Sequence, residues 1–222
     1  MPAVLRSALR QPNAVLFAAQ LAAVLLYPFM EGRAVGRPLF SVFGILVLGL
    51  VLLAVRASPA LTWIAILLGA PATVLLVIQA TTRRDTLMPY SSALEATLYF
   101  YAAVALIRYM LADHEITRDE LWAVGATFTL VAWAFAYTYT VCQAIEPDSF
   151  AASTQSGEHR TWMELLFLSF TNLTSAGLSD VTPVRPFARG LVMLEQIAGL
   201  AYVAMLVSRL VGLAVMRTRG RE

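Results

Sequence analysis

The sequence predicts an all-α membrane protein with six transmembrane helices, a shorter re-entrant half-helix and a loop that follows the half-helix. Hydrophobic residues make up 59% of the 222 residues and charged residues only 14%, and the mean hydropathy is +0.71. These values lie far from those of soluble domains. The apolar residues gather in long stretches, and one helix-like stretch between the last two is too short to cross a membrane.

Six apolar stretches provide the expected spans. A helix rises about 1.5 Å per residue, so roughly 20 apolar residues cross a hydrocarbon core about 30 Å thick. The stretches that reach or approach this length are residues 13–30, 38–55, 61–80, 92–112, 121–144 and 187–216. We expect the first four to form an N-terminal domain, residues 1–112, which a charged linker, residues 113–120, joins to a second domain, residues 121–222.

The distribution of arginine favours cytoplasmic termini. Arginine carries all the basic charge, because the sequence contains no lysine. With six spans and both termini in the cytoplasm, nine arginines fall inside and seven outside. Short cytoplasmic loops are enriched in basic residues, and the polar, acidic loop 146–160 then lies outside. We therefore expect a multi-pass protein of the cell membrane. Because the arginines are dispersed, no nucleic-acid partner is expected.

Three Ser/Thr-x-x-Glu patterns precede apolar stretches and predict helix starts. In such a capping box, the hydroxyl and the carboxylate satisfy otherwise unpaired N–H groups at the beginning of a helix. For Glu95 and Glu164, which would otherwise be costly charges in the membrane, we favour this interpretation over a buried charge. The three patterns are Ser92 with Glu95, Thr117 with Glu120, and Thr161 with Glu164.

The segment between the fifth and sixth spans is typical of a pore. Residues 162–174 are helix-like and would extend only about 20 Å, too short to cross. The residues that follow, 175–183, are small and polar and argue against continued helix. Non-helical backbone persists at membrane depth only where it is buried in protein or lines a water-filled cavity. A half-helix followed by such a loop, between two full spans, therefore predicts a pore.

Residues 169–183 read Ser-Phe-Thr-Asn-Leu-Thr-Ser-Ala-Gly-Leu-Ser-Asp-Val-Thr-Pro. This segment resembles the potassium-channel pattern S-F-x-T-x-T-T-V-G-Y-G-D-x-x-P, with Thr174, Gly177, Asp180 and Pro183 in register. Residues 189–212 are similar to the inner helix of bacterial two-span pore modules, with Gly199 where that family commonly has a hinge glycine. From residue 121 to about residue 217, the chain thus resembles the tetrameric potassium-channel-like superfamily of bacterial type.

The resemblance implies a homotetramer with four-fold symmetry. Each chain would contribute an outer helix (121–144), a turret (145–160), a pore helix (162–174), a filter (175–180) and an inner helix (187–216). Backbone carbonyls and hydroxyls would replace the hydration shell of monovalent cations in a central file. The implied ion-conducting residues are Thr174, Ser175, Ala176, Gly177, Leu178 and Ser179, of which the last five would bind the cation through their oxygens.

Further residues follow from the same resemblance. Asp180 either braces the filter from behind or is a charged residue at the outer mouth, and these alternatives are equally favoured. Glu195 lies in the inner helix, where a charge costs about 2.5–3.5 kcal/mol at the membrane centre, so we expect a partner from the filter or the half-helix. Gly199 would act as a gating hinge. No cofactor is implied apart from K⁺ or other monovalent cations as permeant ions, and the partners would be further copies of the chain and membrane lipids.

The filter departs from the family at two positions. Ser179 replaces the second filter glycine, and a non-glycine residue in a left-handed conformation costs about 1–2 kcal/mol. Leu178 replaces the filter tyrosine and removes its phenol. Both changes predict altered or weakened K⁺ selectivity. The fourth span contains a single arginine, Arg108, whereas steep voltage gating needs several charges, because each is worth only about 2.3 kcal/mol per 100 mV.

The leading hypothesis is therefore a passive cation channel without steep voltage gating. The alternative is a non-conducting scaffold or regulatory membrane subunit that keeps the pore fold. An enzyme ranks below both, because the sequence contains no metal-ligand cluster, nucleophile elbow or phosphate loop. Cys142 is the only cysteine, so an intrachain disulfide is excluded.

Overall fold

The computed structural model of the chain describes residues 11–30, 36–56, 61–82, 85–112, 117–152 and 159–219, and it is mostly helical, as the sequence predicts. Parts of the predicted linker (113–116) and turret (153–158), together with both chain ends, lie outside the described residues. The elements in order are α2 (Pro12–Met30), α3 (Gly36–Arg56), α4 (Thr62–Thr82), the 3-10 turn η1 (Asp85–Leu87), α5 (Met88–Leu111), α6 (Arg118–Ile145), β1 (Phe150–Ala152), α7 (Trp162–Leu173), β2 (Val181–Pro183) and α8 (Pro186–Arg219).

Four of the described helices are long and apolar enough to cross a membrane. The segments that qualify by length and composition are Thr62–Gln79, Met88–Met110, Asp119–Ile145 and Pro186–Gly212. The apolar parts of α2 and α3, Pro12–Tyr27 and Phe43–Arg56, are shorter. Four candidate spans are therefore established for the described part of the chain, and the full number of six stays a prediction.

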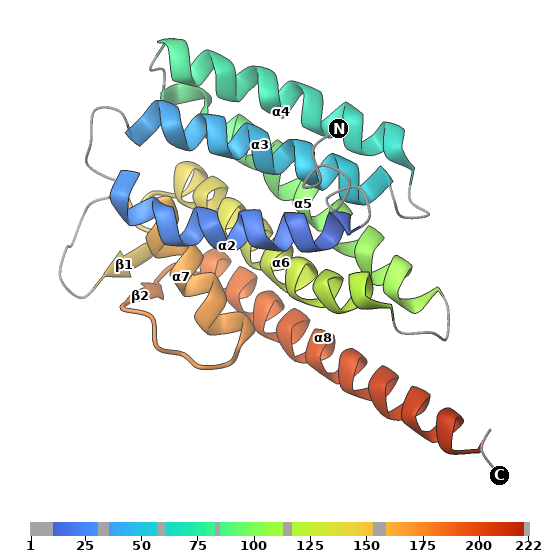
Figure 1. Cartoon of the computed structure of the whole chain (residues 1–222). Coiled ribbons are helices and arrows are strands. Elements are labelled where there is room, and N and C mark those ends of the chain that lie inside the picture. Colours follow the sequence, from blue (N-terminus) through green and yellow to red (C-terminus); the bar gives the residue numbers. More distant parts are fainter. Residues whose placement is uncertain are drawn as a thin grey trace, which may run out of the picture.

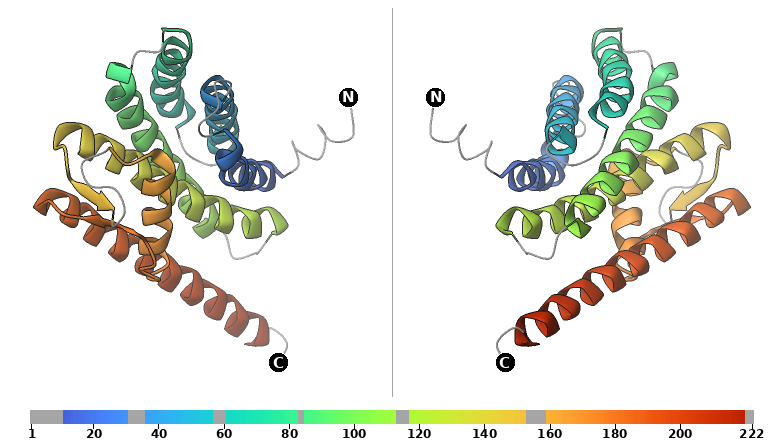
Figure 2. Two further views of the ribbon diagram at one scale, coloured as in Figure 1. Left: turned by 90° about the vertical axis from the view of Figure 1, so that its left-hand side faces the viewer. Right: turned by 90° about the vertical axis from the view of Figure 1, so that its right-hand side faces the viewer.

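Helix α6 lies at the centre of the arrangement. It packs against α2 and α5 on one side and against α7 and α8 on the other. Figures 1 and 2 show α3 and α4 on the far side of the bundle from α8, which extends past the other helices toward the C-terminus. The short α7 lies between α6 and α8 and runs at a steep angle to both (Figure 2).

Edge-to-face and tilted aromatic contacts fix the start of α7. Trp162 is its first residue, and its ring lies 5.4 Å from that of Trp133 and 5.6 Å from that of Tyr137, both on α6. Tyr99 of α5 extends the cluster, with ring centroids 6.0 Å from Trp133 and 5.6 Å from Tyr137. Such pairs contribute about 0.5–1.5 kcal/mol each beyond the area that they bury. The cluster therefore ties the N-terminal helices to the half-helix.

The predicted helix start at Ser92 is wrong. Helix α5 begins at Met88 with Pro89 in its first turn, where the missing N–H of proline costs nothing, so Ser92 and Glu95 lie inside the helix. Glu95 is only 2% exposed, and its carboxyl lies beside the phenols of Tyr99 and Tyr137. It is a buried carboxyl and not a cap.

The start of α6 agrees better with the sequence pattern. The Thr117 side chain accepts a hydrogen bond of 3.2 Å from the Glu120 N–H. The Glu120 carboxylate also reaches Arg209 on α8, with 3.0 Å between Oε2 and Nη2. The beginning of α6 is thereby joined to the far part of α8.

A small antiparallel ribbon was not expected from the sequence. Strands β1 and β2 pair Phe150 with Pro183 and Ala152 with Val181. A further bond of 2.8 Å runs from the Val184 N–H to the Ser149 carbonyl. The ribbon ties the segment before α7 to the segment after the loop that follows α7, so the chain is not purely helical.

Candidate functional site: the half-helix and its loop

The N-terminus of the half-helix α7 carries the capping box that the sequence predicts. The Thr161 N–H donates to Glu164 Oε2 at 2.6 Å, and the Glu164 N–H donates to Thr161 Oγ1 at 3.3 Å. The 12 residues of α7 extend about 18 Å at 1.5 Å each, well short of a membrane core of about 30 Å. Helix α7 therefore enters the bundle and ends inside it.

The loop after α7 folds back onto the end of that helix. The N–H groups of Ala176 and Gly177 both donate to the Thr171 carbonyl, at 2.9 and 3.1 Å. This geometry requires left-handed backbone, and Ser175 and Gly177 have φ of 58° and 65°. Two successive N–H groups that converge on one oxygen form a nest, here around a carbonyl that the helix leaves unpaired.

The direction of two carbonyl groups follows from these bonds. In a planar trans peptide, the N–H and C=O groups point in opposite directions. Because the Ala176 and Gly177 N–H groups point at α7, the carbonyls of Ser175 and Ala176 point away from it. Residues 174–178 are all exposed in the single chain, so this part of the loop is open to a ligand. Aligned carbonyls on a short loop are able to bind a dehydrated cation.

The outer part of the loop differs from the geometry that the family resemblance implies. Among the described residues, only Asp148 and Ser175 are non-glycine residues with positive φ, so Ser179 does not adopt the left-handed conformation. Its hydroxyl instead accepts a hydrogen bond of 3.1 Å from the Val181 N–H. The Leu178 side chain is 78% exposed. Ser179 therefore avoids the cost of a left-handed conformation, because its φ is not positive.

Two further predicted site residues lie beside the loop. The Thr174 hydroxyl donates to the Phe170 carbonyl at 2.7 Å, so it is turned back toward α7. Asp180 is exposed, and within the described part of the chain its carboxylate forms no hydrogen bond or ion pair. The bracing role of Asp180 stays a prediction.

Glu195 has the half-helix partners that the sequence led us to expect. It is 0% exposed and lies on α8 against α6 and α7. Ser169 of α7 contacts its Oε1, and the Tyr139 hydroxyl of α6 donates to its Oε2. The Asn172 side-chain amide donates to the same Oε2 at 3.3 Å. Ser169 also donates to the Ala132 carbonyl at 2.8 Å. These bonds connect α6, α7 and α8 behind the loop.

Gly199 lies where α8 crosses the end of α7. A Cβ atom at this position would stand 2.8 Å from Leu173 Cα and 2.9 Å from Leu173 C, closer than side-chain carbons approach backbone. Helix α8 is continuous through Gly199. The structure thus gives this glycine a packing role that the sequence did not indicate, and the predicted hinge role is untested.

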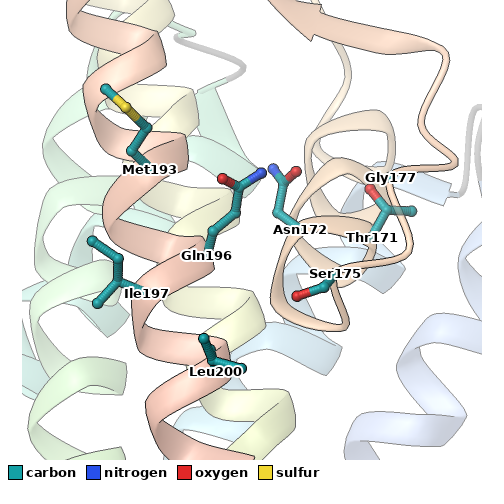
Figure 3. A pocket seen from close by; sticks show the side chains of 8 residues that line it. All are labelled: Thr171, Asn172, Ser175, Gly177, Met193, Gln196, Ile197 and Leu200. Carbon is teal, nitrogen blue, oxygen red and sulfur yellow. The ribbon is translucent and has the colours of Figure 1, made fainter.

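A hollow separates the loop from the inner helix. Its volume is about 510 Å³. Figure 3 shows the Asn172 and Gln196 amides facing each other across it, with polar groups from α7 and the loop on one wall and mostly apolar side chains from α8 on the other. The lining residues are Thr171, Asn172, Ser175, Gly177, Met193, Gln196, Ile197 and Leu200. Within the described ranges, no group of three or more His, Cys, Asp or Glu residues could hold a metal ion.

Comparison with known protein families identifies a match in the same segment. Residues 125–215 match the model of a family described as an ion channel. This segment comprises most of α6, all of α7 and its loop, and most of α8, and it is less than half of the 222 residues. No curated protein and no solved structure matches the chain. The similarity therefore concerns α6, α7 and α8, and it does not extend to α2–α5.

Proposed function

We propose that this chain is one subunit of a homotetrameric channel that conducts monovalent cations passively across the cell membrane. One observation carries the proposal: the Ser175 and Ala176 carbonyls point away from a half-helix that ends between two apolar helices. The similarity of residues 125–215 to an ion-channel family supports it. Four copies of the loop around one axis would form a file of carbonyl oxygens.

The half-helix would contribute electrostatically. The C-terminus of a helix carries about half a negative elementary charge, which favours a cation near its end. Four such termini would converge below the filter. Transport of this kind needs neither catalysis nor a cofactor, and the permeant ions are K⁺ or other monovalent cations.

Copies of the chain and lipids are the proposed partners, and nucleic acid is not. Helix α8 exposes large apolar side chains along its length, including Leu194 (59%), Ile197 (65%) and Leu200 (68%). Water would be a poor solvent for this face, and neighbouring subunits and lipid would cover it. With six spans, both termini would lie in the cytoplasm.

We further propose that selectivity for K⁺ is altered or weakened. The left-handed residues Ser175 and Gly177 give the inner part of the loop its geometry, but Ser179 does not extend that pattern outward. Fewer aligned carbonyl rings would discriminate less between K⁺ and Na⁺.

Ion flux into liposomes that contain the purified tetramer tests the function. We expect K⁺ and Na⁺ to pass with a small ratio of rates. Ser179→Gly should raise that ratio, because glycine reaches left-handed backbone without the cost of about 1–2 kcal/mol that serine incurs. Ser179→Ala is the matched control, since it removes the hydroxyl and keeps the restricted backbone. Sharp K⁺ selectivity in the unchanged protein would contradict the proposal.

The same preparation distinguishes a cation channel from the alternative, a non-conducting subunit. A tetramer that transports no cation and shows no ions along its four-fold axis would be a non-conducting scaffold or regulatory subunit, as the exposed Leu178 and the departure at Ser179 would permit. Voltage dependence should be shallow, because Arg108 is the single basic residue of α5.

A further inference from the structure

We infer that Glu195 is a protonated, neutral carboxylic acid at neutral pH, and that its ionisation moves the hydrogen bond of Ser169 from the outer helix to the inner helix. Glu195 thus acts as a proton-operated positioning residue behind the filter. The regulatory part of this inference rests on the proposed channel function, whereas the protonation state does not.

Counting hydrogens leads to the protonation state. The Ser169 hydroxyl has one hydrogen and contacts two oxygens, the Ala132 carbonyl at 2.8 Å and Glu195 Oε1. A carbonyl oxygen only accepts, so the bond to Ala132 uses the serine hydrogen. The contact between Ser169 Oγ and Glu195 Oε1 then lacks a hydrogen unless Glu195 supplies one. A protonated carboxyl supplies it and donates to Ser169 Oγ.

The second carboxyl oxygen completes the arrangement. Glu195 Oε2 accepts from the Tyr139 hydroxyl and from the Asn172 amide, which is a donor through its nitrogen. A neutral acid with one donating and one accepting oxygen satisfies all four contacts of the network. An ionised carboxylate only accepts and leaves either the Ala132 bond or the Oε1 contact without a hydrogen.

No positive charge compensates Glu195 among the described residues that surround it. The described groups that contact its carboxyl are Tyr139 from α6 and the uncharged Ser169 and Asn172 from α7. Cys142, one turn further along α6, lies near Tyr139. Within the described residues, no arginine pairs with Glu195. A buried carboxylate without a cationic partner is strongly disfavoured relative to the neutral acid.

Ionisation therefore acts as a switch between two partners of Ser169. With a neutral Glu195, the Ser169 hydrogen ties α7 to the Ala132 carbonyl of α6. With an ionised Glu195, the same hydrogen is attracted to the carboxylate on α8, because a bond to a charged acceptor is the stronger of the two. The half-helix that supports the filter loop would then lose its side-chain bond to α6, and conduction would fall.

Infrared spectroscopy of the full-length protein in lipid tests the protonation state directly. The difference spectrum between unchanged protein and Glu195→Gln at neutral pH should show the C=O stretching band of one protonated carboxylic acid. Asp148→Asn is the control, because it removes an exposed carboxyl at a residue with φ of 61°, a conformation that asparagine tolerates. The band should persist in that variant. A difference spectrum that contains only carboxylate bands would overturn the inference.

Flux measured at neutral and alkaline pH tests the switch. Losing the neutral hydrogen bond from Ser169 to the Ala132 carbonyl shifts an equilibrium by about two- to tenfold, so the alkaline-to-neutral flux ratio should be lower by about that factor in unchanged protein than in Glu195→Gln. Equal ratios in the two proteins would refute the switch. If no variant conducts, the channel proposal fails. The switch is then tested by the melting temperature, and a melting temperature that falls at alkaline pH only when Glu195 is present still supports it. A melting temperature independent of Glu195 then refutes it.

Discussion

Replacing Gly199 with alanine should separate the inner helix from the half-helix. The added Cβ would stand 2.8 Å from Leu173 Cα and 2.9 Å from Leu173 C. Carbon atoms pack best at about 3.5–4.0 Å, so the two helices must part by about 1 Å. The opposing atoms are backbone and cannot rotate away as a side chain would.

The expected magnitude combines two terms. Overpacking of this kind costs about 1–3 kcal/mol, and the upper end applies because both surfaces are helical backbone. Alanine in place of glycine within a helix gains about 0.5–1 kcal/mol. We expect Gly199→Ala to lower the free energy of unfolding by about 2 kcal/mol.

Gly190→Ala provides a control on the same helix. No atom lies within 4 Å of the added Cβ at that position, so only the gain in helix propensity of about 0.5–1 kcal/mol applies. The two variants should therefore differ by about 3 kcal/mol in denaturant unfolding of the detergent-solubilised protein. If Gly199→Ala is as stable as Gly190→Ala, the packing argument is wrong.

Two contacts at helix ends allow further predictions. Glu120→Gln should destabilise the protein by about 3 kcal/mol, because it removes one partner of a largely buried ion pair. A second change, Arg209→Gln, should add little to that loss. Additive losses in a double-mutant cycle would show that the two side chains are not coupled. Thr161→Ala should cost about 0.5–2 kcal/mol through loss of the α7 cap. Thr97→Ala, at an exposed mid-helix position, should be nearly neutral in the same unfolding assay, and similar losses for both would rule out a specific capping contribution.

The half-helix could be predicted from the sequence because its signals are local. Thr161 and Glu164 define its start within four residues, and the small residues from Ser175 onward define its end. The sequence predicts that Glu195 has a hydrogen-bond partner, because an uncompensated carboxyl inside a span is costly, but it does not predict which residue that partner is. Its identity depends on Tyr139, which is 56 residues away in the chain.

The remaining differences also have physical causes. The Ser-x-x-Glu pattern at Ser92 misled because it occurs inside a helix, and Pro89 three residues earlier was the better start signal. The β1–β2 ribbon joins segments on either side of α7, and strands of three residues carry too little alternation to be recognised. For Ser179, the cost of left-handed backbone indicated that the usual geometry is disfavoured, but it could not indicate the bond to the Val181 N–H.

The central position of α6 has a consequence for the tolerance of the protein to mutation. In its apolar segment 61% of residues are buried, compared with 22% in that of α4. Ala123, Ala126, Ala132, Ala134 and Ala136 are all 0% exposed, so neighbouring helices approach α6 from several sides and leave no room for larger side chains. Sequence variation among functional variants should accordingly be narrowest along α6 and widest along α4, whose outward side chains need only remain apolar.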